Sequence, residues 1–227
     1  MTKDGRFNAV WNYFQPPVRL YKANFDDYIP KTNEQAAAAK KCSVYAENGI
    51  ENISQGQGLF MSGSVGTGKT HLAIATVRNL ITKQLDRFGV RDCLSCSEND
   101  FYDAQERKYD GLYCSFFCVV DLLNILRQGF NDDYKRRRAD WFLSRARGDE
   151  LIVLDDIGAE KTTDWVLEQL YSIIDLRYRM QRSTIITSNC SIRELEAQIG
   201  PRTVSRIIDM TNGIKVEGPD YRKRKLA

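Results

Sequence analysis

Residues 63–70, GSVGTGKT, join a glycine-rich stretch to a cation and a hydroxyl. They fit the pattern G-x-x-x-x-G-K-[ST], in which glycines let consecutive backbone N–H groups point at one anion. Lys69 can reach the β- and γ-phosphates of a nucleoside triphosphate, and the Thr70 hydroxyl can ligate Mg²⁺. The predicted nucleotide-binding residues in this stretch, with the histidine after it, are Gly63, Ser64, Val65, Gly66, Thr67, Gly68, Lys69, Thr70 and His71.

Two further polar groups follow apolar runs that read as buried strands. In LIVLDD, Asp155 can hold Mg²⁺ through water, and Asp156 can act as general base toward an attacking water. In TIITSN, the amide of Asn189 can orient that water near the γ-phosphate. The simpler alternatives are solvated or capping aspartates and a turn-forming asparagine. We therefore predict ATP and Mg²⁺ as ligands.

Apolar periodicity places these groups at the ends of alternating strands and helices. Such alternation predicts parallel pairing and an α/β layered sheet. Strands are expected at 58–63, 113–120, 150–158, 183–189 and 213–218. Helices are expected at 34–48, 70–85, 121–130, 133–146, 163–180, 191–199 and 202–210.

Composition limits the class of protein. The chain has 227 residues, 42% of them hydrophobic and 28% charged, as in a globular protein. No apolar run approaches the ~20 residues that a membrane span needs, so no membrane partner is expected. Six cysteines without a secretory signal predict reduced thiols in the cytoplasm. Because His71 is the sole histidine, hydrolase triads that need one are disfavoured.

The order of the motifs resembles a known family. GSVGTGKTHLA, LIVLDDIGAE, TIITSN, VSRI and GPDYR are similar, in that order, to the bacterial replicative helicase loaders of the DnaC/DnaI type. Those loaders are AAA+ ATPases related to the IstB-type helper ATPases of transposition. The YKANFDDY stretch resembles the family's lead-in, and the resemblance covers roughly residues 20–222.

The resemblance implies a fold, an activity and partners. The fold is the three-layer AAA+ P-loop sandwich around a central parallel sheet of five strands, with the P-loop strand near its middle. Asn189 would be the first sensor, Arg206 an arginine finger toward a neighbouring subunit, and Arg222 a second-sensor-like residue that contacts nucleotide. The partners would be a replicative DNA helicase, single-stranded DNA and further copies of this chain. Each arginine could instead be a surface or salt-bridging residue.

Two segments flank the expected ATPase core of residues 31–222, and a third is inserted within it. Residues 1–30 form an arm in which Phe7, Val10, Trp11 and Phe14 share one helical face. This face either packs on the chain's own core or is a reduced helicase-docking element that replaces the loaders' separate N-terminal domain. Residues 86–112 look inserted, and residues 223–227 form a basic tail.

Four cysteines in and after the insertion suggest a possible metal site. The spacings C-x₂-C and C-x₃-C would allow a tetrahedral zinc knuckle. Cysteine within a strand pattern is also a common small core residue. The candidate zinc ligands are Cys93, Cys96, Cys114 and Cys118.

Several functions share this ATPase chemistry. The leading hypothesis is a helicase loader whose basic clusters at 135–138, 177–182 and 222–225, with Tyr178 interleaved, track the phosphates of single-stranded DNA. A second is an ATP-switched adaptor with negligible turnover, which the short side chain of Asp156 would permit. A transposase helper is a third. A small-molecule kinase would leave TIITSN and VSRI without a role.

Overall fold

The computed structural model describes residues 2–89, 112–130 and 133–226. Its centre is a five-stranded sheet in the order β2-β3-β4-β1-β5, and every neighbouring pair is parallel. The strands are β1 (Gly58–Ser62), β2 (Cys114–Cys118), β3 (Leu151–Ile157), β4 (Ser183–Ser188) and β5 (Thr211–Lys215). The predicted α/β P-loop fold is therefore confirmed, with β1 second from one edge.

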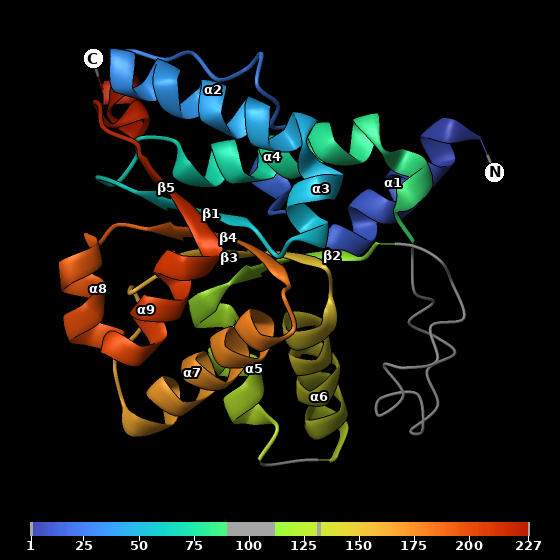
Figure 1. Ribbon diagram of the computed structural model, residues 1–227, viewed down its shortest axis with the longest axis vertical. Coiled ribbons are helices and arrows are strands. Elements are labelled where there is room, and N and C mark those ends of the chain that lie inside the picture. The colour runs from blue at the N-terminus through green and yellow to red at the C-terminus, as the bar shows by residue number, and fades with distance from the viewer. Residues whose placement is uncertain (1, 90–111, 131–132, 227) are drawn as a thin grey trace.

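Helices cover both faces of this sheet (Figure 1). On one face lie α1 (Lys3–Phe14), α2 (Asn33–Glu47), α3 (Gly49–Ser54) and α4 (Lys69–Lys83). On the other lie α5 (Val119–Gln128), α6 (Asp133–Gly148), α7 (Asp164–Arg179), α8 (Ile192–Ile199) and α9 (Pro201–Met210). Short 3₁₀ turns are η1 (Val18–Leu20), η2 (Leu85–Arg87) and η3 (Tyr221–Leu226). No helix in the described ranges is long and apolar enough to cross a membrane.

The strands are buried on both faces, which explains their continuous apolar sequences. Successive side chains of a strand point to opposite faces. Thus Val153 packs in the core beneath α1, α2 and α4, while Ile152 and Leu154 pack in the core against α5 to α9. The two cores fix the strands in register and so fix where their carboxyl ends lie.

Helix α1 packs on the chain's own core. Trp11 is fully buried, its Nε1 donates to the Tyr21 carbonyl at 3.0 Å, and its ring lies 5.1 Å from that of Phe14. Phe14 in turn meets Phe116 of β2 edge to face at 6.0 Å. The apolar face predicted from the sequence is therefore occupied within the chain, and a helicase-docking role for this helix stays a prediction.

The ends of the expected insertion meet at the edge of the sheet. Phe88 and Leu112 form a parallel bridge, and Gly89 N donates to Leu112 O at 2.9 Å. Residues 90–111 between them lie outside the described residues. The described residues on either side of this gap are therefore adjacent in space, immediately before β2.

Trp11→Ala tests the docking of α1. We expect the free energy of unfolding to fall by about 3–5 kcal/mol, because a buried aromatic side chain is lost and a cavity is left. Urea denaturation measures the change. The matched control is Val18→Ala, at a side chain that is 92% exposed, which should change stability by less than about 0.5 kcal/mol. Equal stability of the Trp11 variant and the wild type would contradict the packing.

Candidate functional site

The glycine-rich stretch forms a tight loop between β1 and α4. Gly66 has φ of 77° and Gly68 has φ of 97°, both in the left-handed region that favours glycine. A Cβ at Gly68 would also lie 2.6 Å from the ring of Tyr28. The loop delivers the chain to Lys69, the first residue of α4, so that the positive end of the helix faces the loop.

The ammonium group of Lys69 ties this loop to β4. Its Nζ donates to the carbonyl oxygens of Gly63 and Ser64 and to Asn189 Oδ1, each at 2.8 Å. Burial lowers the pKa of Lys69, and the carboxylates of Asp156 and Asp155 act in the opposite direction. The lysine is therefore held where the loop would receive an anion.

The two acids at the end of β3 face the same pocket as the lysine. Burial raises the pKa of Asp155, while hydrogen bonds from Thr187 and Thr70 act to lower it. Asp156 Oδ1 accepts a hydrogen bond from Asn189 Nδ2 at 2.5 Å. Lysine, amide and carboxylate thus form a continuous polar chain across the ends of β1, β4 and β3.

These side chains line a pocket of about 340 Å³, within the range of small-molecule sites. The predicted site residues that line it are Val65, Gly66, Gly68, Lys69, Thr70, His71, Asp155, Asp156, Asn189 and Arg222. Gly63, Ser64 and Thr67 belong to the loop but do not line the pocket. The carbonyl oxygens of the first two accept from Lys69, and Thr67 Oγ1 donates to Ser64 O at 2.9 Å.

The oxygen ligands at the base of the pocket fit Mg²⁺. Thr70 offers a hydroxyl and Asp155 a carboxylate, and hard oxygen ligands of this kind suit that ion when phosphate oxygens and water complete its shell. When bound with a triphosphate, Mg²⁺ neutralises charge on the β- and γ-phosphates.

The sequence patterns missed the wall of the pocket contributed by residues before α2. Arg19, Leu20, Asp27, Tyr28 and Ile29 line it from the N-terminal segment, and Thr187 and Tyr221 line it from β4 and the C-terminal turn. The YKANFDDY stretch was a usable signal, since it contains two of these residues.

Hydrogen bonds hold that segment against the loop. Tyr28 Oη donates to Thr67 O at 3.1 Å, the fully buried Gln35 donates to the same oxygen at 3.3 Å, and Asn24 O lies 2.8 Å from His71 Nε2. Tyr221 N donates to Gly66 O at 2.9 Å from the C-terminal side. Figure 1 shows this C-terminal turn beside the start of α2.

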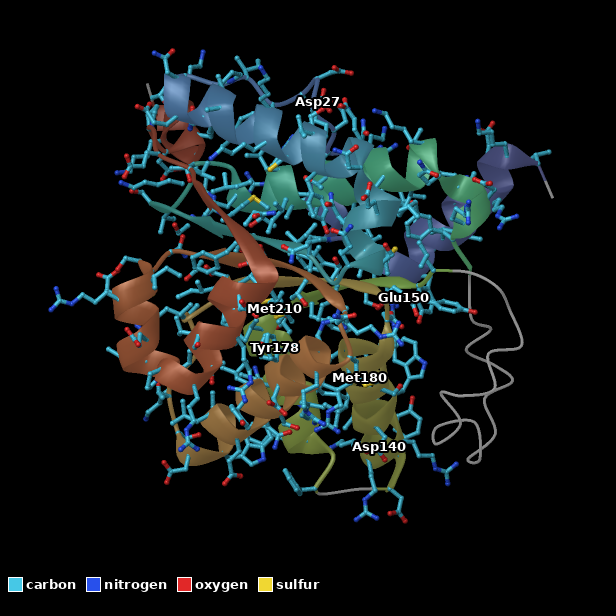
Figure 2. The ribbon with its side chains drawn as sticks, in the orientation of Figure 1. Asp27, Asp140, Glu150, Tyr178, Met180 and Met210 are labelled. Atoms are coloured by element: carbon cyan, nitrogen blue, oxygen red, sulfur yellow. The ribbon has the colours of Figure 1, made fainter. Side chains whose placement is uncertain are left out.

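Arg206 does not line this pocket. Its guanidinium lies on α9, where Nε donates to Asp175 Oδ1 at 2.8 Å and the group stacks 5.0 Å from the ring of Tyr171. It borders a separate hollow with Tyr178. Figure 2 shows Tyr178 across the sheet from Asp27, which lines the nucleotide-sized pocket. The predicted finger is thus directed away from the chain's own loop.

The structure does not support the candidate four-cysteine zinc site for the two cysteines that it describes. Cys114 and Cys118 are the first and last residues of β2, so their Cα atoms are about 13 Å apart at the rise of a strand. Cys114 is a core residue, and burial raises its pKa well above the usual value. Cys93 and Cys96 lie outside the described residues. Within the described ranges no group of three or more His, Cys, Asp or Glu side chains is arranged to hold a metal ion.

Arg177 also corrects an expectation. It is fully buried and donates to Thr184 Oγ1 at 2.8 Å and to the carbonyl of Asp149 at 2.9 Å. It therefore joins α7 to β4 and cannot follow a nucleic-acid backbone, in contrast to the expectation for the cluster at 177–182.

Comparison with known proteins agrees with this architecture. The profile of the family described as "IstB-like ATP binding protein" matches residues 104–227, more than half of the chain. The chain belongs to the IstB-like ATP-binding protein family. The family match begins after the phosphate loop, so the loop is assigned from its own sequence and geometry.

Relatives of this IstB-like protein include helicase loaders. The crystal structure of the DnaC helicase loader is 30% identical, with a TM-score of 0.68, and the match covers 88% of this chain and all of that one. The replicative helicase loader DnaC of Escherichia coli K12 is 22% identical over 81% of this chain. Domain III of Thermotoga maritima DnaA, at 19% identity and a TM-score of 0.63, shares the fold over 90% of this chain and 71% of that one.

The IstB-like chain spans only part of the curated relatives that it matches. The aligned region covers 62% of the Escherichia coli loader and 42% of the uncharacterized protein YqaM of Bacillus subtilis, which is 24% identical over 69% of this chain.

Asp155→Asn tests the electrostatic cost of the site. Because burial raises the pKa of Asp155 in the folded state, its ionised form destabilises the fold at neutral pH. We expect the nucleotide-free variant to melt at a higher temperature than the wild type at pH 7, because the amide carries no charge to desolvate. This difference in melting temperature should shrink as the pH falls toward about 3.9, the pKa of an aspartate in the unfolded chain.

Differential scanning fluorimetry across this pH range measures the effect. Asp140→Asn, at an exposed position on α6, is the control and should melt like the wild type. An Asp155 variant that melts at or below the wild-type temperature at pH 7 would refute the assignment of a desolvated carboxylate.

Proposed function

We propose that this protein is an ATPase that helps to place a replicative DNA helicase on single-stranded DNA. The observation that supports it most directly is the convergence of Lys69, Thr70, Asp155, Asp156 and Asn189 on one pocket. These are the group types that phosphoryl transfer to water requires, and two of the similar proteins carry the name of helicase loader. A cytoplasmic location follows from such a role.

Each side chain has a distinct part in the proposed hydrolysis. Lys69 would exchange its three oxygen acceptors for phosphate oxygens when a triphosphate enters the loop. Asn189, released from the lysine, would orient the attacking water, and Asp156 would accept its proton. Arg222 would contact the nucleotide from the C-terminal side of the pocket.

Comparing Lys69→Ala with Asp156→Asn tests this division of roles. We expect Lys69→Ala to lose ATP binding by calorimetry, because the loop loses its cation. Asp156→Asn should bind ATP and lose at least about 100-fold in turnover, as expected for a general base. An adaptor without turnover predicts a different result, in which Asp156→Asn still supports helicase loading. Absence of binding heat for the wild type with Mg²⁺-ATP would refute nucleotide binding altogether.

A second subunit would complete the site. Arg206 is held by Asp175, Tyr171 and Tyr178 at a hollow separate from the chain's own pocket, and we propose that it acts on nucleotide bound to a neighbouring copy. Such a finger contributes about 10³–10⁵ in turnover in other phosphoryl-transfer enzymes.

Mixing two inactive variants tests the finger. Arg206→Ala keeps the pocket and loses the finger, whereas Lys69→Ala keeps the finger and loses the pocket. Each alone should be inactive, and a mixture should recover ATPase activity that rises with protein concentration. Arg202→Ala, on the same helix, is the control and should retain activity. A mixture as inactive as its components would overturn action between subunits.

Single-stranded DNA is the second proposed partner. The start of α6 carries the exposed basic residues 135–138, beside the exposed rings of Phe130 and Tyr134. Positive charge combined with aromatic faces suits backbone contact and base stacking. A helper ATPase for a transposase would use the same chemistry, and the family name keeps it as the second candidate.

A further inference from the structure

The two acids at the end of β3 should not face the same way in a regular strand. Asp155 and Asp156 are consecutive, and successive side chains of a strand point to opposite faces. Both nevertheless line the nucleotide-sized pocket. Some local departure from strand geometry must turn Asp156 toward its neighbour.

That departure is a β-bulge opposite Thr187. The β3–β4 register is regular up to the pair Leu154–Ile186 and resumes at Ile157–Ser188. Between these pairs, two residues of β3 stand opposite one residue of β4, as in a bulge. Asp156 has φ of 63°, a left-handed conformation that residues other than glycine seldom adopt.

A single hydroxyl group holds both acids in this arrangement. Thr187 Oγ1 donates to Asp155 Oδ1 at 2.7 Å and accepts from the backbone N–H of Asp156 at 2.9 Å. The direction is unambiguous, because an ionised carboxylate can only accept and a backbone N–H can only donate. The hydroxyl thus satisfies the amide left unpaired by the bulge and also orients the carboxylate.

The position of Thr187 is itself rigid. Its side chain is 1% exposed and β-branched, which restricts χ1, and its backbone pairs with Met61 of the strand that leads into the phosphate loop. Asn189 follows two residues later, on the same side, and holds the Asp156 carboxylate. The hydroxyl therefore holds both acids in a fixed position relative to the loop that would hold the phosphates.

We propose that Thr187 is the positioning residue for the magnesium-binding and water-activating acids of this site. The proposal rests on the proposed nucleotide binding. Through its hydroxyl, Thr187 fixes Asp155 toward Thr70 and keeps Asp156 in its left-handed conformation, so that both acids line the pocket proposed to bind nucleotide. Groups that orient metal ligands in this way typically change metal affinity about 10–100-fold when they are removed.

Thr187→Val and Thr187→Ser provide the test, because valine keeps the shape without the hydroxyl and serine keeps the hydroxyl. Binding of a fluorescent ATP analogue is measured while Mg²⁺ is titrated, and again in EDTA. For Thr187→Val we expect the Mg²⁺ concentration at half-maximal binding, the Mg²⁺ midpoint, to rise at least about tenfold. For serine we expect a midpoint near that of the wild type. In EDTA the analogue should bind all three proteins equally, because Lys69 and the loop amides are unchanged.

Controls separate positioning from damage. Thr76→Val removes another buried hydroxyl, one that donates to its own helix, and should leave the Mg²⁺ midpoint unchanged. If the Thr187→Val variant does not fold, the Thr187→Cys variant replaces it, since a thiol is a weak donor and acceptor. Its midpoint should lie above that of serine, and a midpoint equal to serine's would overturn the proposal.

Other outcomes are equally decisive. An unchanged midpoint for valine, or an equal loss of binding in EDTA, would overturn a positioning role. A serine variant as impaired as valine would do the same. A wild type that binds no analogue at any Mg²⁺ concentration would instead refute the proposed function, and this inference with it.

Discussion

Three neighbouring parallel strands with a shared carboxyl edge are the constraint on which the site depends. β4 lies between β1 and β3, so the loop after β1, the acids of β3 and the polar end of β4 must meet. Burial on both faces by two separate cores prevents any strand from slipping in register. The side chains of the site thus lie where each strand ends and the backbone becomes irregular. The regular part of each strand holds these ends in position.

Within that edge, the polar groups satisfy one another. Lys69 is bonded to its own loop and to Asn189, and Asn189 is bonded to Asp156. A buried ammonium without such acceptors would be costly. Under the proposed function, a phosphate group would exchange one set of oxygen partners of Lys69 for another.

Segments distant in sequence enclose the pocket. Tyr28 and Gln35 reach the loop from the N-terminal side, and Tyr221 reaches it from the C-terminal side. Earlier in the N-terminal arm, Trp11 and Phe14 pack in the same core as the buried residues of α4. The stability of the arm and the shape of the pocket are therefore linked through one hydrophobic cluster.

Apolar periodicity and motif spacing predicted the α/β fold and the residues of the loop and acids, because both depend on local sequence. The sequence did not indicate Thr187, Tyr28 or Gln35 as parts of the site, since each acts through a partner distant along the chain. It also favoured an exposed Arg177, which tertiary packing buries. A bulge that turns Asp156 beside Asp155 depends on the neighbouring strand. Local patterns therefore determined which chemistry is present, and only strand pairing decided which side chains orient it.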